Sequence, residues 1–270
     1  MYKNVLLILL ITSLSLFAYS DYDMDGVDDK IDQCPNTPFE DLVDEKGCSI
    51  KSLESPHHFD VIFGIDFSQT SYETMEKTDT ITNTLQVDYY YKDFSLQASS
   101  SYYKNQSDTY NNNGLDDSFI GAYYKLTPLY NLTIRLGAGL VLPTYNTDLN
   151  NNNTDYTASA NLSYMLENIN IFGGIGYTII NDDDINGVVA YKNTNSYSIG
   201  LGFYPTQKLY LSSAYNSNES IYEGVEDLDT LSIYGFYSID SNWFTSFSYA
   251  YGLTDSASDN SVSFRVGYYF

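Results

Sequence analysis

The sequence predicts an all-β protein: a 12-stranded antiparallel transmembrane β-barrel preceded by a small, loop-rich, disulfide-closed calcium module. Three observations lead to this prediction. Apolar and polar side chains alternate in segments of residues 57–270, and the connections between these segments are alternately short and long. A stretch of regularly spaced acidic residues precedes them in the chain. The expected boundaries are 1–20 for a signal peptide, 21–48 for the module, 49–56 for a linker and 57–270 for the barrel.

The first twenty residues have the pattern of a secretory signal peptide. Lys3 precedes an apolar run from Val5 to Phe17, which is too short for a spanning helix of roughly 20 residues. The small residues Ala18 and Ser20 then precede a cleavage point before Asp21, where no cysteine is available for lipid attachment. A short N-terminal anchor is the alternative interpretation.

Composition limits the partners and the mode of membrane insertion. The chain has 12 Lys and Arg against 35 Asp and Glu, a net charge of −23, which disfavours nucleic acid as a partner. No later apolar run is long enough for a spanning helix, so insertion into a membrane has to use β-strands.

The stretch that starts at Asp21 carries carboxylates at positions 1, 3, 5, 9 and 12, with Gly26 at position 6. This is the spacing of an EF-hand-type calcium loop, in which alternate side chains point inward and the glycine permits a sharp turn. Calcium is a hard cation that takes oxygen ligands, and this stretch supplies them. An acidic, disordered tail is the alternative.

The flanking residues strengthen this interpretation. Asp-x-Asp-x-Asp-Gly-Val-x-Asp-x-x-Asp-x-Cys-Pro-x-Thr-Pro, continuing to Gly47-Cys48, resembles a thrombospondin type 3 repeat. Such repeats are associated with calcium binding and adhesion, and outer-membrane proteins place them beside a barrel. The resemblance implies the following calcium ligands: Asp21, Asp23, Asp25, Val27 through its carbonyl, Asp29 and Asp32.

We expect Cys34 and Cys48 to form a disulfide, as is common in exported chains. Closing a loop of about fifteen residues stabilises a fold by about 3 kcal/mol in the chain-entropy model. So small a module needs the bridge and the ion, because it has almost no core. No histidine lies at ligand spacing, which disfavours zinc.

The barrel prediction rests on twelve alternating segments. Leu132, Ile134, Leu136, Ala138 and Leu140, for example, share one face of a single segment. Most segments have ten to twelve residues, enough for a tilted transmembrane strand. They lie near 58–68, 80–91, 94–104, 118–126, 131–142, 155–166, 169–180, 195–204, 208–217, 228–239, 242–252 and 260–270.

The connections predict the orientation. Those at 92–93, 127–130, 167–168, 205–207 and 240–241 are tight, whereas the others are longer and polar. Outer-membrane barrels have short periplasmic turns and long external loops. We therefore expect the outer membrane of a Gram-negative bacterium, with the N-terminal module in the periplasm. A secreted, soluble β-sandwich or lipocalin-like barrel is the main rival.

Two further patterns agree with a membrane barrel. The final Phe270 resembles the C-terminal signature of outer-membrane proteins, which implies the barrel assembly machinery as a partner, beside outer-membrane lipid. Aromatic residues also lie near the short turns, as in an interfacial girdle. They are Tyr89, Tyr91, Phe94, Tyr124, Tyr130, Tyr164, Tyr210, Tyr237 and Trp243.

The polar face is expected to line a lumen. It is rich in serine and in glycines such as Gly137, Gly139, Gly200 and Gly202, which we expect to leave space inside. Its few charges are Asp60, Asp66, Asp88, Lys125, Arg135 and Arg265. Salt bridges among these charges are the favoured interpretation, and a ring that selects solutes is the alternative.

These features favour a narrow passive channel for small hydrophilic solutes. A closed barrel serving as an anchor or adhesion protein, with a periplasmic partner, is the alternative. An enzyme is not expected. Outer-membrane phospholipases also have twelve strands, but His57 and His58 would lie at the periplasmic end, away from the external leaflet, as exposed linker residues.

Overall fold

The computed structural model describes residues 21, 23, 27, 29–37, 43, 45–48, 57–71, 77–108, 111–145 and 151–270. The predicted signal peptide (1–20) and linker (49–56) lie outside these residues.

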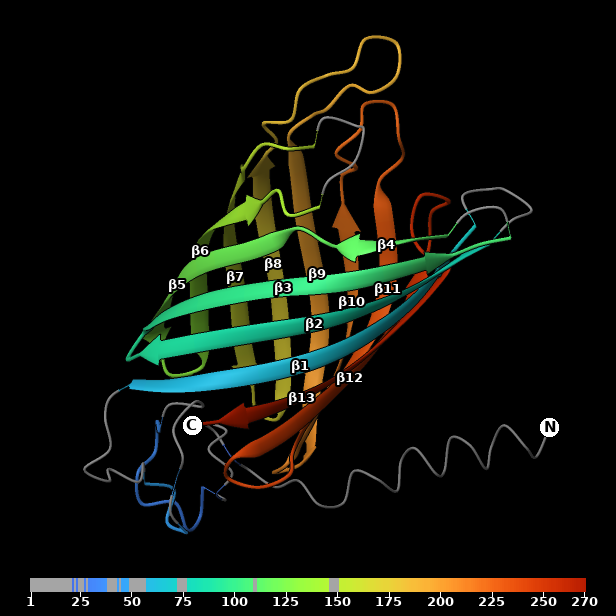
Figure 1. Ribbon diagram of the computed structural model, residues 1–270. Coiled ribbons are helices and arrows are strands. Elements are labelled where there is room, and N and C mark those ends of the chain that lie inside the picture. The colour runs from blue at the N-terminus through green and yellow to red at the C-terminus, as the bar shows by residue number, and fades with distance from the viewer. Residues whose placement is uncertain are drawn as a thin grey trace, which may run out of the picture.

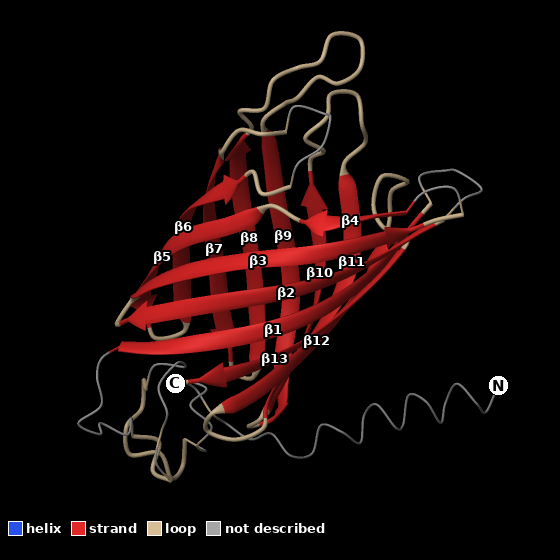
Figure 2. Cartoon of the chain, viewed as in Figure 1, coloured by secondary structure: helices blue, strands red, loops and turns tan. Residues whose placement is uncertain are grey.

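The described strands, all within residues 57–270, form one antiparallel sheet (Figures 1 and 2). Its strands are β1 (His57–Thr70), β2 (Thr78–Tyr91), β3 (Phe94–Gln106), β4 (Asn111–Leu115), β5 (Ser118–Leu129), β6 (Leu132–Leu142), β7 (Asp155–Leu166), β8 (Ile169–Ile179), β9 (Thr194–Thr206), β10 (Leu209–Asn218), β11 (Leu228–Ser238), β12 (Trp243–Gly252) and β13 (Asn260–Tyr269).

The sheet closes on itself into a barrel. Each of β6 to β12 pairs with its sequence neighbours, and β5 pairs with β6 and β3. β13 pairs with β1, β1 with β2, and the β2–β3 pairing completes the ring. β4 adds no further position, because β3 pairs with β4 through Tyr102–Gln106 and with β5 through Phe94–Ser99. β4 and β5 together form one strand interrupted at Asp116 and Asp117. The predicted 12-stranded barrel is confirmed.

One expected loop is a strand. Asn111, Asn112 and Asn113 were expected in a polar connection, but they belong to β4 and pair with Gln106, Asn105 and Lys104 of β3. Backbone pairing does not require apolar side chains, so alternation cannot reveal a strand with two polar faces.

The apolar face of the barrel points outward. Ile175 and Ile199 have 67% and 64% of their surface exposed, and large apolar side chains of the other strands lie on the same face. A soluble β-sandwich would turn this face into a packed core, so the arrangement argues against that rival. Among the described residues, no helix is long and apolar enough to cross a membrane.

The two ends of the barrel differ as the sequence predicts. Two-residue turns join β2 to β3 and β7 to β8, and Lys92 and Glu167 in them have φ of 54° and 55°, as primed hairpin turns require. The C-terminus and the described residues of 21–48 lie at this short-turn end (Figure 1). The long loops extend from the opposite end.

Candidate functional site

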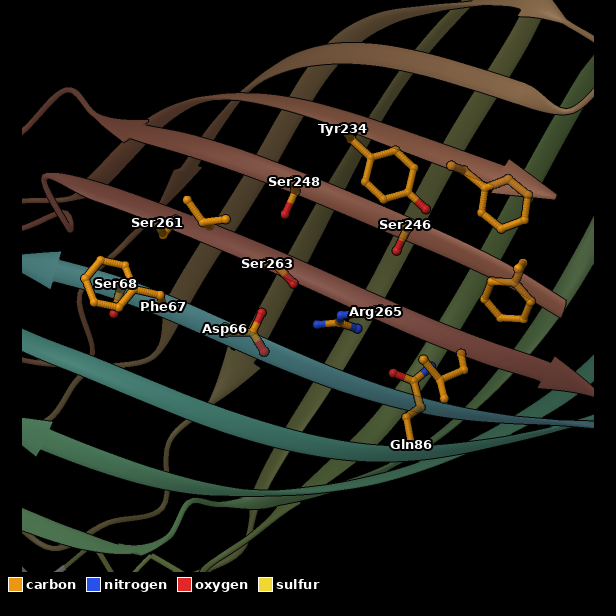
Figure 3. Close-up of a pocket in the computed structure, with 14 residues that line it drawn as sticks. Asp66, Phe67, Ser68, Gln86, Tyr234, Ser246, Ser248, Ser261, Ser263 and Arg265 are labelled. Carbon is orange, nitrogen blue, oxygen red and sulfur yellow. The ribbon is translucent and has the colours of Figure 1, made fainter. Parts of the chain in front are cut away.

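The lumen is the candidate site, and two cavities lie along its wall. The larger, of about 470 Å³, is lined by β1, β2 and β11–β13 and contains Asp66 and Arg265 (Figure 3). The smaller, of about 250 Å³, is lined by β6–β9 and contains Arg135. Hydroxyl, amide and charged groups share the lining of the larger cavity with aromatic rings, which suits solutes that carry hydrogen-bonding groups, whereas the lining of the smaller cavity is mainly apolar.

The charged lumen residues come from two regions of the wall. Asp60 of β1 stands opposite Asp88 of β2, and both are buried. Lys125 of β5 stands opposite Arg135 of β6. Like charges that face each other across a strand pair repel, and the charges of Arg135 and Arg265 partly offset this repulsion at Asp88.

The expected salt bridges across the interior are not formed by four of the six lumen charges. Asp66, Asp88, Arg135 and Arg265 make no ion pair with any described residue. Arg135 instead lies over the Tyr123 ring, 3.9 Å from its centroid. The favoured sequence interpretation is wrong for these four residues, because none of them comes within ion-pair distance of an opposite charge among the described residues.

The lumenal glycines do not leave the open space that we expected. A Cβ at Gly137 would stand 2.6 Å from the Tyr123 ring, and one at Gly200 would stand 2.3 Å from the Phe172 ring. Rings of inward-facing residues therefore lie flat against glycines of the neighbouring strands. Only glycine permits so close an approach, so these glycines keep the rings against the wall.

Aromatic rings line the lumen near the short turns. Tyr204 and Tyr210 have ring centroids 4.8 Å apart, and Phe244 lies 5.4 Å from Phe236 and 4.6 Å from Tyr269. Phe244 is only 6% exposed. This end of the lumen is consequently narrowed by aromatic side chains.

One member of the predicted outer girdle belongs to this inner set. Tyr210 faces the lumen, where its hydroxyl accepts a hydrogen bond from Asn170 Nδ2 at 3.1 Å. The prediction for Tyr210 is wrong, because its neighbours Leu209 and Leu211 are the residues of β10 that share the outer face. Other predicted members, including Tyr130 and Trp243, are exposed on the outside.

The two histidines open β1 and are not linker residues. The His57 ring stacks on Tyr91 with centroids 4.8 Å apart, and His58 stacks on Tyr90 at 4.7 Å. The three consecutive tyrosines at the end of β2 supply these stacking partners. β1 therefore begins at His57, before its apolar and polar side chains start to alternate. Sequence reasoning gave these tyrosines no such role.

The N-terminal module is closed by the predicted Cys34–Cys48 disulfide. The Gln33 N–H donates to the Lys46 carbonyl at 2.8 Å inside the loop. The buried Thr37 hydroxyl lies 2.6 Å from the Gly47 carbonyl oxygen. The bridge and these hydrogen bonds hold the two ends of the module together.

Two of the predicted calcium ligands contact this closed loop. Asp23 Oδ2 accepts a hydrogen bond from the Thr37 N–H at 2.5 Å, and Asp32 Oδ1 accepts one from the Cys34 N–H at 2.7 Å. Asp23 Oδ1 is buried and has no hydrogen-bond partner among the described residues. Asp25 lies outside the described residues. In the described part of the chain, no group of three or more Asp, Glu, His or Cys side chains is placed so that it could hold a metal ion.

The long-loop end carries a group of carboxylates. Burial, opposed by the hydrogen bond from the Tyr145 N–H, raises the pKa of Asp117, and the charges of Asp116, Asp182 and Asp155 raise it further. These loops therefore place negative charge at one opening of the barrel.

Comparison with known proteins shows the fold. No protein-family model matches the chain, and no curated protein is significantly similar to it in sequence. An outer-membrane channel from Pseudomonas putida F1 is similar in structure, with a TM-score of 0.64 and 13% identity, over 81% of this chain and 97% of that one. The NanC porin (TM-score 0.50, 15% identity, 78% and 98% covered) and the KdgM porin (TM-score 0.51, 10% identity, 78% and 98% covered) are also similar. Residues 57–270 thus have the closed β-barrel fold of porin-like outer-membrane channels.

Proposed function

We propose that residues 57–270 form a passive channel for small hydrophilic solutes in the outer membrane of a Gram-negative bacterium. The observation that carries this proposal is the combination of an apolar outer face with a polar lumen in which Asp66, Asp88, Arg135 and Arg265 form no ion pair with any described residue. A barrel needed only as an anchor gains nothing from keeping such charges in its interior.

The outer face supports the membrane location. Each large apolar side chain moved from water to hydrocarbon contributes about 1.5–3 kcal/mol, and strands of the whole barrel present such side chains. The similar fold of known outer-membrane channels supports the same location.

The connections support an orientation. Short turns face the periplasm in barrels of this kind, which would put the N-terminal module and the C-terminus there. The acidic loops near Asp117 and Asp182 would face outward. A periplasmic partner of the module fits this orientation.

The aromatic side chains near the short turns favour a second candidate, a closed barrel that acts as an anchor or adhesion protein. Phe236, Phe244 and Tyr269 pack together inside the lumen, and hydrophobic constrictions can stop conduction by excluding water.

Single-channel recordings on purified protein in planar bilayers separate the two candidates. The channel predicts stepwise, ohmic conductance, with only the smallest polyethylene glycols able to enter and reduce it. A Phe244→Ala variant provides the comparison. If wild type is silent and Phe244→Ala conducts, the barrel is closed by its aromatic side chains and the channel proposal fails.

We also propose that the N-terminal module binds one calcium ion through Asp21, Asp23, Asp25, Val27, Asp29 and Asp32. The buried Asp23 Oδ1 supports the proposal, because a carboxylate oxygen without a hydrogen-bond partner among the described residues is costly unless a cation compensates it. The buried Val27 is in keeping with a residue that turns its carbonyl into a closed loop. A bound ion would compensate the charge at this buried oxygen of Asp23.

A further inference from the structure

The larger lumenal cavity contains one carboxylate and one guanidinium that do not form an ion pair with each other. Asp66 of β1 and Arg265 of β13 both line it, half-buried, and neither makes a hydrogen bond or an ion pair through its side chain with any described residue. Two opposite charges that face one cavity without an ion pair are a recognition pattern for a ligand, because each is partly desolvated and keeps its hydrogen-bonding atoms for an incoming group.

The strand register keeps the two charges apart. Asp66 pairs with Ser263, and Gly64 pairs with Arg265, so Asp66 and Arg265 are diagonal neighbours. Diagonal neighbours lie about 7–8 Å apart. A Cβ at Gly64 would stand 3.3 Å from Arg265 Cγ, so the arginine stem lies over this glycine. Figure 3 shows Asp66, Ser263 and Arg265 along one stretch of wall.

Asp88 does not form an ion pair with Arg265. Its carboxylate is within electrostatic reach of Arg265, but Asp88 Oδ2 accepts a hydrogen bond from Gln86 Nε2 at 2.8 Å. Because Arg265 makes no side-chain hydrogen bond or ion pair with a described residue, its guanidinium keeps its donors for a group that enters the cavity. A guanidinium binds carboxylates well, because its donors match their geometry.

The remaining walls suit a small polar molecule with an aliphatic part. Ser248 and Ser263 lie opposite each other beside Asp66, and their hydroxyls can donate or accept hydrogen bonds. Phe236 and Phe244 form an apolar patch in the same cavity. Such a cavity offers a carboxylate site, an ammonium site and an apolar surface.

We propose that this cavity is a binding site for small zwitterions of the α-amino-acid class, which carry a carboxylate for Arg265 and an ammonium for Asp66. The inference rests on the proposed channel function and deepens it by naming the solute. A passing zwitterion would neutralise both charges at once, whereas a simple anion or cation leaves one of them uncompensated.

The test is equilibrium binding to the full-length barrel in detergent, measured by calorimetry. The probes are L-alanine and its two halves: propionate, which lacks the ammonium, and ethylamine, which lacks the carboxylate. For so small a ligand we expect a dissociation constant on the order of 10 mM for alanine. Each half should bind about tenfold more weakly or worse, because one charged hydrogen bond is lost.

Variants assign the two charges. Asp66→Asn and Arg265→Gln should each weaken alanine binding about tenfold or more. Lys208→Gln is the control, because this exposed lysine lies in the short turn between β9 and β10 and lines neither cavity, and alanine binding should stay unchanged. The exchange of both charges, Asp66→Arg with Arg265→Asp, should restore binding within a few-fold, since the ligand can turn end for end. A merely structural role of either residue does not predict this rescue.

Three results would overturn the inference. Propionate that binds as tightly as alanine would make the cavity an anion site, and ethylamine that does so would make it a cation site. No saturable alanine binding up to about 100 mM, well above the expected range, leaves no site. A barrel that conducts but does not bind alanine refutes only this inference, and one that binds alanine but never conducts refutes only the channel.

Discussion

At the scale of single residues, pairs of glycine and aromatic side chains shape the lumen. Tyr123 lies over Gly137 and Phe172 over Gly200, so each ring is held flat by the absence of a Cβ on the adjacent strand. Flat rings take up less of the lumen than rings that project inward. The glycines therefore affect the width of the lumen through the rings that they accommodate.

The calcium prediction can be tested by substituting single carboxylates. The test compares Asp25→Ala with Asp28→Ala in the oxidised full-length protein. Exported modules bind calcium with Kd on the order of 10⁻⁴–10⁻³ M. Asp25→Ala should reduce binding much more than Asp28→Ala, since position 8 is not a ligand position in such loops. Calorimetry with calcium, and with magnesium as a poorly matched competitor, measures the difference.

Equal losses from both substitutions would mean that calcium is attracted only by diffuse negative charge. Absence of saturable binding up to about 10 mM, above the expected affinity range, would reduce residues 21–48 to an acidic spacer.

At the scale of the strand, the chain end that follows β13 is tied to the first strand, β1. The Phe270 N–H donates to the Phe59 carbonyl of β1 at 2.8 Å, and its ring contacts Tyr268 with centroids 4.7 Å apart. Phe270 is nevertheless 71% exposed. An exposed aromatic ring at the seam is available for recognition during assembly.

Replacing this ring should impair assembly more than it impairs the finished barrel. We expect Phe270→Ser to lower the amount of barrel in the outer membrane, and Phe270→Tyr to preserve it, because the resemblance to the signature of outer-membrane proteins implies that the assembly machinery recognises this aromatic residue. Outer-membrane fractions at limiting expression, analysed on gels without boiling, provide the measurement.

Phe264→Ser is the control on the same strand and face. If it lowers assembly as much as Phe270→Ser, the loss reflects fewer lipid contacts, and Phe270 has no special role.

At the scale of the whole molecule, the barrel is held together by a continuous ring of backbone pairing, not by a packed apolar interior. Val27, Tyr103, Met165, Phe244 and Ala257 are the buried apolar residues among those described. Closure pairs every strand of the ring except the short β4 with two neighbours. Such a barrel should unfold as a unit and only under harsh conditions.

We therefore expect the detergent-solubilised protein to migrate differently on a gel before and after boiling, and to give a β-type circular dichroism spectrum before boiling. The apolar outer face requires detergent or lipid, since its exposure to water is unfavourable. Recovery of a soluble monomer from the periplasm without detergent would contradict the membrane barrel.

The sequence by itself determined the strands and their faces, since side chains of a strand alternate by geometry and a membrane barrel needs one apolar face. It also determined the closing disulfide, and all six lumen charges were named from alternation. Only the tertiary structure decided which of these charges share a cavity. Asp66 and Arg265 are far apart in the chain, and their juxtaposition depends on the register at which β13 closes onto β1. Tyrosines over glycines, and a polar strand such as β4, likewise depend on a neighbouring strand that no local pattern encodes.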